Sequence, residues 1–142
     1  MRCLWLVFWF WMVSLHPYSG KVDVTIQGNE KSPHYARPLV ATVNNSTEQT
    51  KNLDWPVGSL FASDAEGVQD MVLTRPVMVT LKPGEQKEIE LYAMCIEQSN
   101  RAPGNTHTYQ RNGIAKGSLL QMAHLAHFNE EHNFPMQQWV WD

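Results

Sequence analysis

Short runs of alternating apolar and polar residues, separated by turn-forming residues, dominate the first two thirds of this chain. Val22, Val24 and Ile26 alternate with polar residues, which is the pattern of a strand with one buried face. Turn residues interrupt the runs regularly, as in Lys82-Pro83-Gly84-Glu85, where Pro presets φ and Gly permits a positive φ. We expect strands near residues 22–26, 39–43, 51–55, 60–61, 71–74, 77–81 and 89–95. About seven short strands with such spacing predict a mainly β fold, an immunoglobulin-like β-sandwich.

The N-terminus has the three-part layout of a secretion signal. Met1-Arg2 is a short positive start, residues 3–13 form an unbroken apolar run, and residues 14–20 are polar and turn-forming. The apolar run is shorter than the about 20 residues that a membrane-spanning helix needs. We therefore expect residues 1–19 to be a signal peptide, cleaved near Ser19 or Gly20, with an uncleaved membrane anchor as the alternative. The mature chain would be secreted or held at the cell surface, without a membrane span.

Charge and length restrict the function classes. The formal net charge is −3, and loss of Arg2 with the signal would make it −4. Basic residues do not cluster, which argues against a nucleic-acid partner. About 120 residues remain after cleavage, enough for one domain with its own core.

The pattern changes after Cys95. Residues 97–117 are polar and rich in Asn, Gly and Pro, and we expect a long loop there. Ser118-Leu119-Leu120-Gln121 predicts a capping box that opens a helix, and Leu119, Met122, Ala123 and Ala126 follow at helical spacing on the face toward the sandwich. That helix should end before Phe134, and Pro135 suits the first turn of a second, short helix. The domain would thus comprise a sandwich body over residues 20–96 and a loop and helical extension over residues 97–142, packed on it.

Cys95 would be the single cysteine of the mature chain, because Cys3 lies in the signal. A leftover cysteine in an oxidising compartment pairs with another chain, stays free, or forms another bond. Cys95 continues the alternation of Ile89, Leu91 and Ala93, so a buried core position also explains it. An inert core cysteine, an intermolecular disulfide and an internal thioester all remain open.

The C-terminal segment Met136-Gln137-Gln138-Trp139-Val140-Trp141 resembles the T-Q-x-A-I/V-W motif of bacterial surface-adhesin thioester domains. Gln137, Val140 and Trp141 match that motif, while Met136 replaces the threonine and Trp139 replaces the alanine. The stretch from Trp55-Pro56-Val57-Gly58 through Tyr92-Ala93-Met94-Cys95 is also similar to uncharacterised secreted bacterial β-sandwich proteins. The first resemblance implies a β-rich body with helical additions and a thioester between Cys95 and Gln137, with Gln138 as the neighbouring candidate. Water would be excluded from that bond by Tyr92, Phe134, Trp139 and Trp141.

Two clusters have metal-ligating side chains. His124, His127 and Glu131 lie at i, i+3 and i+7 on one face of the expected helix, where two histidines and a carboxylate are ligands that zinc accepts. The alternative is a solvated helix face. Asp64, Glu66 and Asp70 offer oxygen ligands for calcium, but their spacing does not match an EF-hand, and a solvated turn is the preferred interpretation.

Residues 44–47, Asn-Asn-Ser-Thr, hold two overlapping N-glycosylation acceptors, which we interpret instead as a polar turn. No nucleophile elbow, phosphate loop or dinucleotide fingerprint is present. The sequence therefore predicts a non-enzymatic binding or adhesion module without a cofactor, whose ligand is an extracellular protein or glycan. A covalent adhesin with a Cys95–Gln137 thioester and a zinc-binding protein using His124 and His127 are the alternatives. The binding module would show an exposed apolar patch or an open strand edge.

Overall fold

The computed structural model describes residues 20–32, 34–130 and 132–141, except for the side chain of Phe134. The predicted signal peptide, residues 1–19, lies outside the described residues. Two sheets and two helices make up the fold, which confirms the mainly β prediction. In chain order the elements are β1 (Val22–Gly28), β2 (Leu39–Asn45), β3 (Lys51–Trp55), β4 (Ser59–Ser63), β5 (Met71–Leu73), β6 (Val77–Leu81), β7 (Gln86–Leu91), β8 (Ala93–Cys95), β9 (Thr108–Ile114), α1 (Gly117–Phe128) and α2 (Phe134–Trp141).

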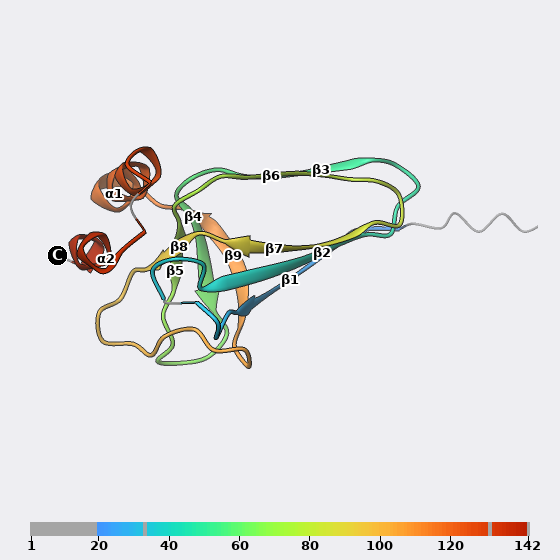
Figure 1. The fold of residues 1–142 in the computed structure, drawn as a ribbon. Coiled ribbons are helices and arrows are strands. Elements are labelled where there is room, and N and C mark those ends of the chain that lie inside the picture. Colours follow the sequence, from blue (N-terminus) through green and yellow to red (C-terminus); the bar gives the residue numbers. More distant parts are fainter. Residues whose placement is uncertain (1–19, 33, 131, 142) are drawn as a thin grey trace, which may run out of the picture.

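The larger sheet has seven antiparallel strands in the order β7-β2-β1-β9-β4-β5-β8. Its two edge strands, β7 and β8, are consecutive in the chain and are separated by Tyr92 alone. The sheet must therefore curl until its two ends meet at this residue, and Figure 1 shows β7 running directly into β8. This curling brings Cys95, at the end of β8, to the same end of the molecule as the C-terminal helices.

Strands β3 and β6 form a separate two-stranded sheet that lies over β7, β2 and β1 (Figure 1). Apolar residues from both layers fill the space between them, including Trp55, Leu81, Val43 and Leu91. The alternation predicted for these strands is therefore present, because every second residue faces this core. The two sheets thus share one apolar core, while the immunoglobulin-like sandwich stays a prediction.

The expected loop over residues 97–117 is wrong in its second half, because β9 lies there and pairs with both β1 and β4. Tyr109 is the one buried residue of β9, and the five residues that follow it in the strand are exposed. A strand with so few buried side chains has no period-two apolar signal, although its backbone is held in the centre of the sheet. Within the segment predicted as an extension, residues 108–114 thus belong to the large sheet.

Both predicted helices are present and bury a second core. Ala123 and Ala126 of α1 and Met136 of α2 pack with Val72 and Met94 of the sheet. The capping-box prediction is wrong: α1 begins at Gly117, and its first turn has no side-chain cap hydrogen bond. Gly117 has a φ of +58°, a value that Gly adopts without strain. Within the part of the chain that the structure describes, neither helix is long and apolar enough to cross a membrane.

Candidate functional site

Cys95 ends β8 with its side chain almost fully buried, at 1% exposure. Its Sγ lies 3.5 Å from the main-chain oxygen of His34, to which the thiol donates a weak hydrogen bond. Burial, and then the nearby negative charge of Glu97, raises the pKa of the thiol to about 12. The folded protein therefore holds Cys95 as a neutral thiol at neutral pH. Its burial also disfavours the intermolecular disulfide, because the side chain is almost unexposed to solvent.

Gln137 from α2 is fully buried against Cys95, 42 residues earlier in the chain. Its Oε1 accepts a hydrogen bond from the Cys95 N–H at 2.8 Å, and its Nε2 donates one to the Cys95 carbonyl at 2.6 Å. The carboxamide thus replaces the peptide group of a neighbouring strand at the free edge of β8. Of the two glutamine candidates, the structure brings Gln137 to Cys95, whereas Gln138 is half-buried elsewhere on the helix.

A cavity of about 80 Å³ opens beside the sulfur of Cys95. The ring of His34 stacks on Trp141 across this space, with 6.1 Å between the ring centres. His34 Nε2 and Trp141 Nε1 are both buried without a hydrogen-bond partner among the described residues. Polar side chains complete the lining, from Gln69, Gln98 and Asn100. The cavity therefore has a mixed polar and apolar lining and is large enough for a water-sized or ammonia-sized molecule.

The four aromatic residues predicted to shelter a thioester have different surroundings. Trp141 lines the cavity beside Cys95, as that prediction requires. Trp139 is 57% exposed and contributes no such cover. Tyr92 packs on Arg75 and His132, and the side chain of Phe134 is not among those described.

The helix carrying His124 and His127 gives no support to the zinc prediction. The two rings lie against Phe128, 6.0 and 5.4 Å from its ring centre. Within the described part of the chain, no three His, Cys, Asp or Glu side chains form a group able to hold a metal. Glu131, the predicted third ligand, lies outside the described residues.

The acidic residues considered for calcium are used by the turn itself. Asp64 accepts hydrogen bonds from the N–H and the hydroxyl of Thr108, and the hydroxyl bond is the main cause that lowers the pKa of this carboxyl. Asp70 accepts a bond from the Ser63 N–H. The Asp64 contacts join the end of β4 to β9, whereas the Asp70 contact closes the turn between β4 and β5, in agreement with the turn interpretation.

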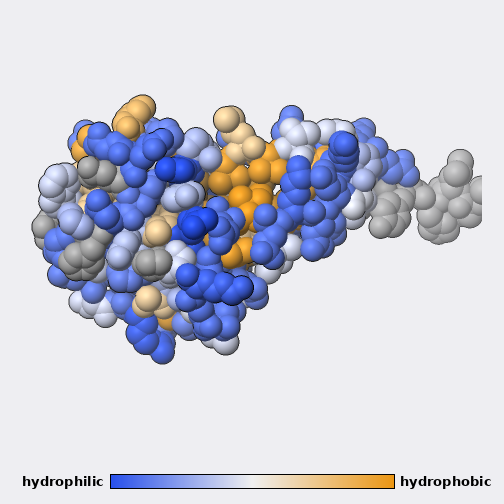
Figure 2. All heavy atoms as spheres, viewed as in Figure 1, coloured by the Kyte–Doolittle hydropathy of each residue, from blue (hydrophilic) through white to orange (hydrophobic). Residues whose placement is uncertain are grey.

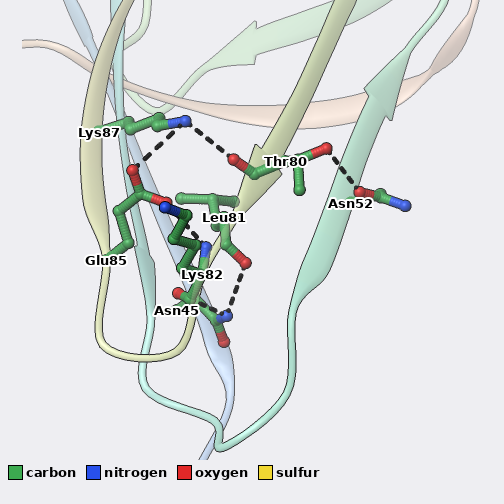
Figure 3. A network of polar contacts seen from close by, with 7 residues as sticks. All are labelled: Asn45, Asn52, Thr80, Leu81, Lys82, Glu85 and Lys87. Carbon is green, nitrogen blue, oxygen red and sulfur yellow. Dashed lines mark hydrogen bonds and ion pairs between the residues drawn. The ribbon is translucent and has the colours of Figure 1, made fainter.

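Asn45, one of the two possible glycosylation acceptors, is fully buried at the end of β2. Its Nδ2 donates to the carbonyls of Gln49, Leu81 and Lys82 at 2.8, 3.1 and 3.0 Å. Figure 3 shows this side chain beside the β6–β7 turn. Asn45 is therefore an anchor of that turn, and a glycan on its Nδ2 would displace these bonds.

An apolar seam runs between β6 and β7, which belong to different sheets. Among the described residues, no backbone hydrogen bond joins the two strands, so each presents an unpaired edge. At the turn end, Lys87 bridges them by donating to the Thr80 carbonyl at 2.8 Å (Figure 3). Beyond Lys87 a groove of about 290 Å³ opens, lined by Val77, Met78, Val79 and Ile89. Figure 2 shows this seam as an apolar patch on an otherwise hydrophilic face.

A group of charged and aromatic side chains lies at the open end of this seam. Arg75 Nε donates to His132 Nε2 at 3.1 Å, and its guanidinium lies 4.1 Å from the centre of the Tyr92 ring. Burial and the charge of Arg75 lower the pKa of His132 to about 4, so the ring is neutral and accepts this bond. Arg37 lies on the same Tyr92 ring and pairs with Glu90 at 2.7 Å. None of the described carboxylates pairs with Arg75.

Sequence reasoning did not find the cavity residue His34 or the seam residue Arg75. Neither belongs to a local motif, and each reaches its site through contacts between distant segments. Comparison with known proteins adds no guidance, because no family model, curated protein or solved structure matches this chain.

Proposed function

We propose that this protein is a secreted or cell-surface binding module that recognises an extracellular ligand without catalysis. The observation that supports this function best is the apolar seam between β6 and β7. Met78 at its rim is 77% exposed, beside the partly buried Val79 and Ile89. Exposed apolar grooves rimmed by polar residues are typical of interaction sites.

The treatment of β8, the other edge strand of the seven-stranded sheet, strengthens this proposal. The edge of β8 is covered by main-chain and side-chain bonds: the Ala93 N–H donates to the Ala36 carbonyl, and the Gln137 carboxamide bonds to the N–H and carbonyl of Cys95. Open strand edges promote unwanted association, so folded proteins usually cover them. An edge that stays open beside an apolar groove is consistent with a binding role.

Binding to arrays of extracellular matrix proteins and glycans tests this function. The protein should bind at least one ligand saturably, and Met78→Glu should weaken that binding at least tenfold. The variant should stay folded, because Met78 is an exposed residue. Leu125→Glu is the matched control, because Leu125 is an exposed apolar residue, 45% exposed, on α1. Absence of saturable binding, or equal loss in both variants, would contradict the proposal.

A covalent form of binding is the second candidate, and the buried contact between Gln137 and Cys95 favours it. In thioester formation the Cys95 sulfur would bond to the Gln137 carboxamide carbon, the carbon–nitrogen bond would break, and ammonia would leave with the thiol proton. An amine of the ligand would then attack that carbon and release the thiol. The neighbouring cavity could admit such a small nucleophile, and His34 Nε2 could accept its proton.

Intact mass of the protein prepared without reductant separates the two forms. A thioester lowers the mass by one ammonia, and methylamine restores it as a covalent adduct. Gln137→Glu and Cys95→Ala should each abolish that deficit, whereas Gln138→Glu should leave it unchanged. If the protein without substitutions has the mass calculated from its sequence, the covalent candidate is eliminated. Non-covalent binding then remains the proposed function.

A further inference from the structure

We propose that the seam between β6 and β7 binds an extended peptide strand of a partner protein, with an acidic side chain of that strand held by Arg75. This inference rests on the proposed binding function and names the chemistry of the ligand. It is drawn from three features that meet in one groove: two open strand edges, an apolar lining, and a cation without a described acidic partner.

The open edges supply main-chain recognition. β6 and β7 lie on either side of the groove, and no described backbone bond joins them. An extended peptide can pair with such an edge through its own N–H and C=O groups, as in other cases of strand addition. Lys87 already occupies the Thr80 carbonyl of β6 near the turn, so the incoming strand has the open end of the seam available.

The apolar lining supplies side-chain recognition. Val77, Val79 and Ile89 face the groove, and Met78 stands at its rim. Alternate side chains of a strand point to one face, so a peptide with apolar residues at every second position would bury them here. Its other side chains would face water, which suits a segment from a soluble extracellular protein.

Arg75 supplies charge complementarity. Its Nε bond to His132 and its stacking on Tyr92 hold the guanidinium in one place, and its terminal NH₂ groups make no described hydrogen bond. Glu90 also borders the groove, but its carboxylate is paired with Arg37. Besides Glu90, the carboxylate of Glu130 lies near enough to raise the pKa of His132, but no described carboxylate forms an ion pair with Arg75. A held, unpaired arginine binds a carboxylate with little further loss of conformational entropy.

A synthetic peptide with blocked ends tests this proposal directly. The probe has about six residues, a glutamate followed by alternating valine and threonine, and a second peptide replaces the glutamate with lysine. In fluorescence anisotropy the glutamate peptide should bind the full protein at least tenfold more tightly than the lysine peptide. Arg75→Gln should remove that preference, while Arg111→Gln on the exposed part of β9 should keep it. Because Arg75 contacts both His132 and Tyr92, a circular dichroism melt checks the folding of the variant.

Amide hydrogen exchange of the complex tests the binding mode. Bound peptide should slow exchange at residues 77–79 and 89–91, with no change in β1, an inner strand of the sheet. No binding up to about 1 mM peptide, no protection of these edges, or a preference unaffected by Arg75→Gln would overturn the inference. Binding of a glycan, or dimerisation of this chain that Met78→Glu abolishes, would also overturn the peptide chemistry but keep the seam as a binding site. Loss of every saturable interaction would remove the proposed function as well.

Discussion

Removal of the Gln137 carboxamide should destabilise the protein by about 2–4 kcal/mol. Gln137→Leu keeps a similar volume but deletes both hydrogen bonds to Cys95, 2.8 and 2.6 Å long. Each bond contributes about 0.5–1.5 kcal/mol net, and a buried group left without a partner costs about 1–3 kcal/mol. The N–H and the carbonyl of Cys95 would both be left without a hydrogen-bond partner. Burial of the leucine side chain offsets part of this loss of stability.

Urea unfolding followed by tryptophan fluorescence measures this change. Gln121→Leu is the matched control, because Gln121 is exposed on α1 and its replacement should change stability by less than about 0.5 kcal/mol. Repeating Gln137→Leu in a Cys95→Ala background separates the hydrogen bonds from any thioester, since alanine keeps the same main chain. Equal losses in both backgrounds indicate hydrogen bonds alone. A loss below about 1 kcal/mol in both backgrounds would refute the role assigned to Gln137.

Two further predictions concern other buried polar groups. Asn45→Ala should lower the free energy of unfolding in urea by about 2–4 kcal/mol, because the buried Leu81 carbonyl loses its hydrogen-bond donor. Asn112→Ala, at an exposed position of β9, is the control. An equal effect of the two substitutions would contradict the anchor role of Asn45. His132 has a folded-state pKa of about 4, below its ordinary value of 6.5. The unfolded chain therefore takes up the proton first, and the stability that neutral His132 contributes is present above pH 6.5 and falls as the pH approaches 4. Thermal melts from pH 7 to 4 should show a loss of about 1–2 kcal/mol, reduced by solvent screening, that His132→Gln removes; an unchanged pH profile in that variant would show the assignment to be wrong.

The strands with a regular apolar alternation were predictable from the sequence. In β6, Val77 and Leu81 are buried while Met78 and Thr80 are exposed, so the period of two was visible. In β1 the same pattern was only partly followed, because Val24, two residues before the buried Ile26, is 39% exposed. β9 was missed because its side chains are largely exposed and its strand conformation depends on backbone bonds to β1 and β4.

The two candidate sites differ in how far the sequence could lead to them. The motif around Gln137 predicted a contact with Cys95, and the structure brings this carboxamide to the main chain of that residue. The sequence did not predict that Gln137 bonds to the main-chain N–H and carbonyl of Cys95, nor that His34 lines the neighbouring cavity. No local pattern links segments so far apart.

The sequence by itself determined the mainly β class, most strand positions and the two C-terminal helices, because burial period and turn chemistry are local properties. Only the tertiary structure decided that the sheet curls until β7 and β8 meet at Tyr92, that β8 is capped by Gln137, and that the seam beside β7 stays open. Strand order and edge exposure depend on which distant segments compete for the same backbone groups. That competition is settled by the packing of the whole chain.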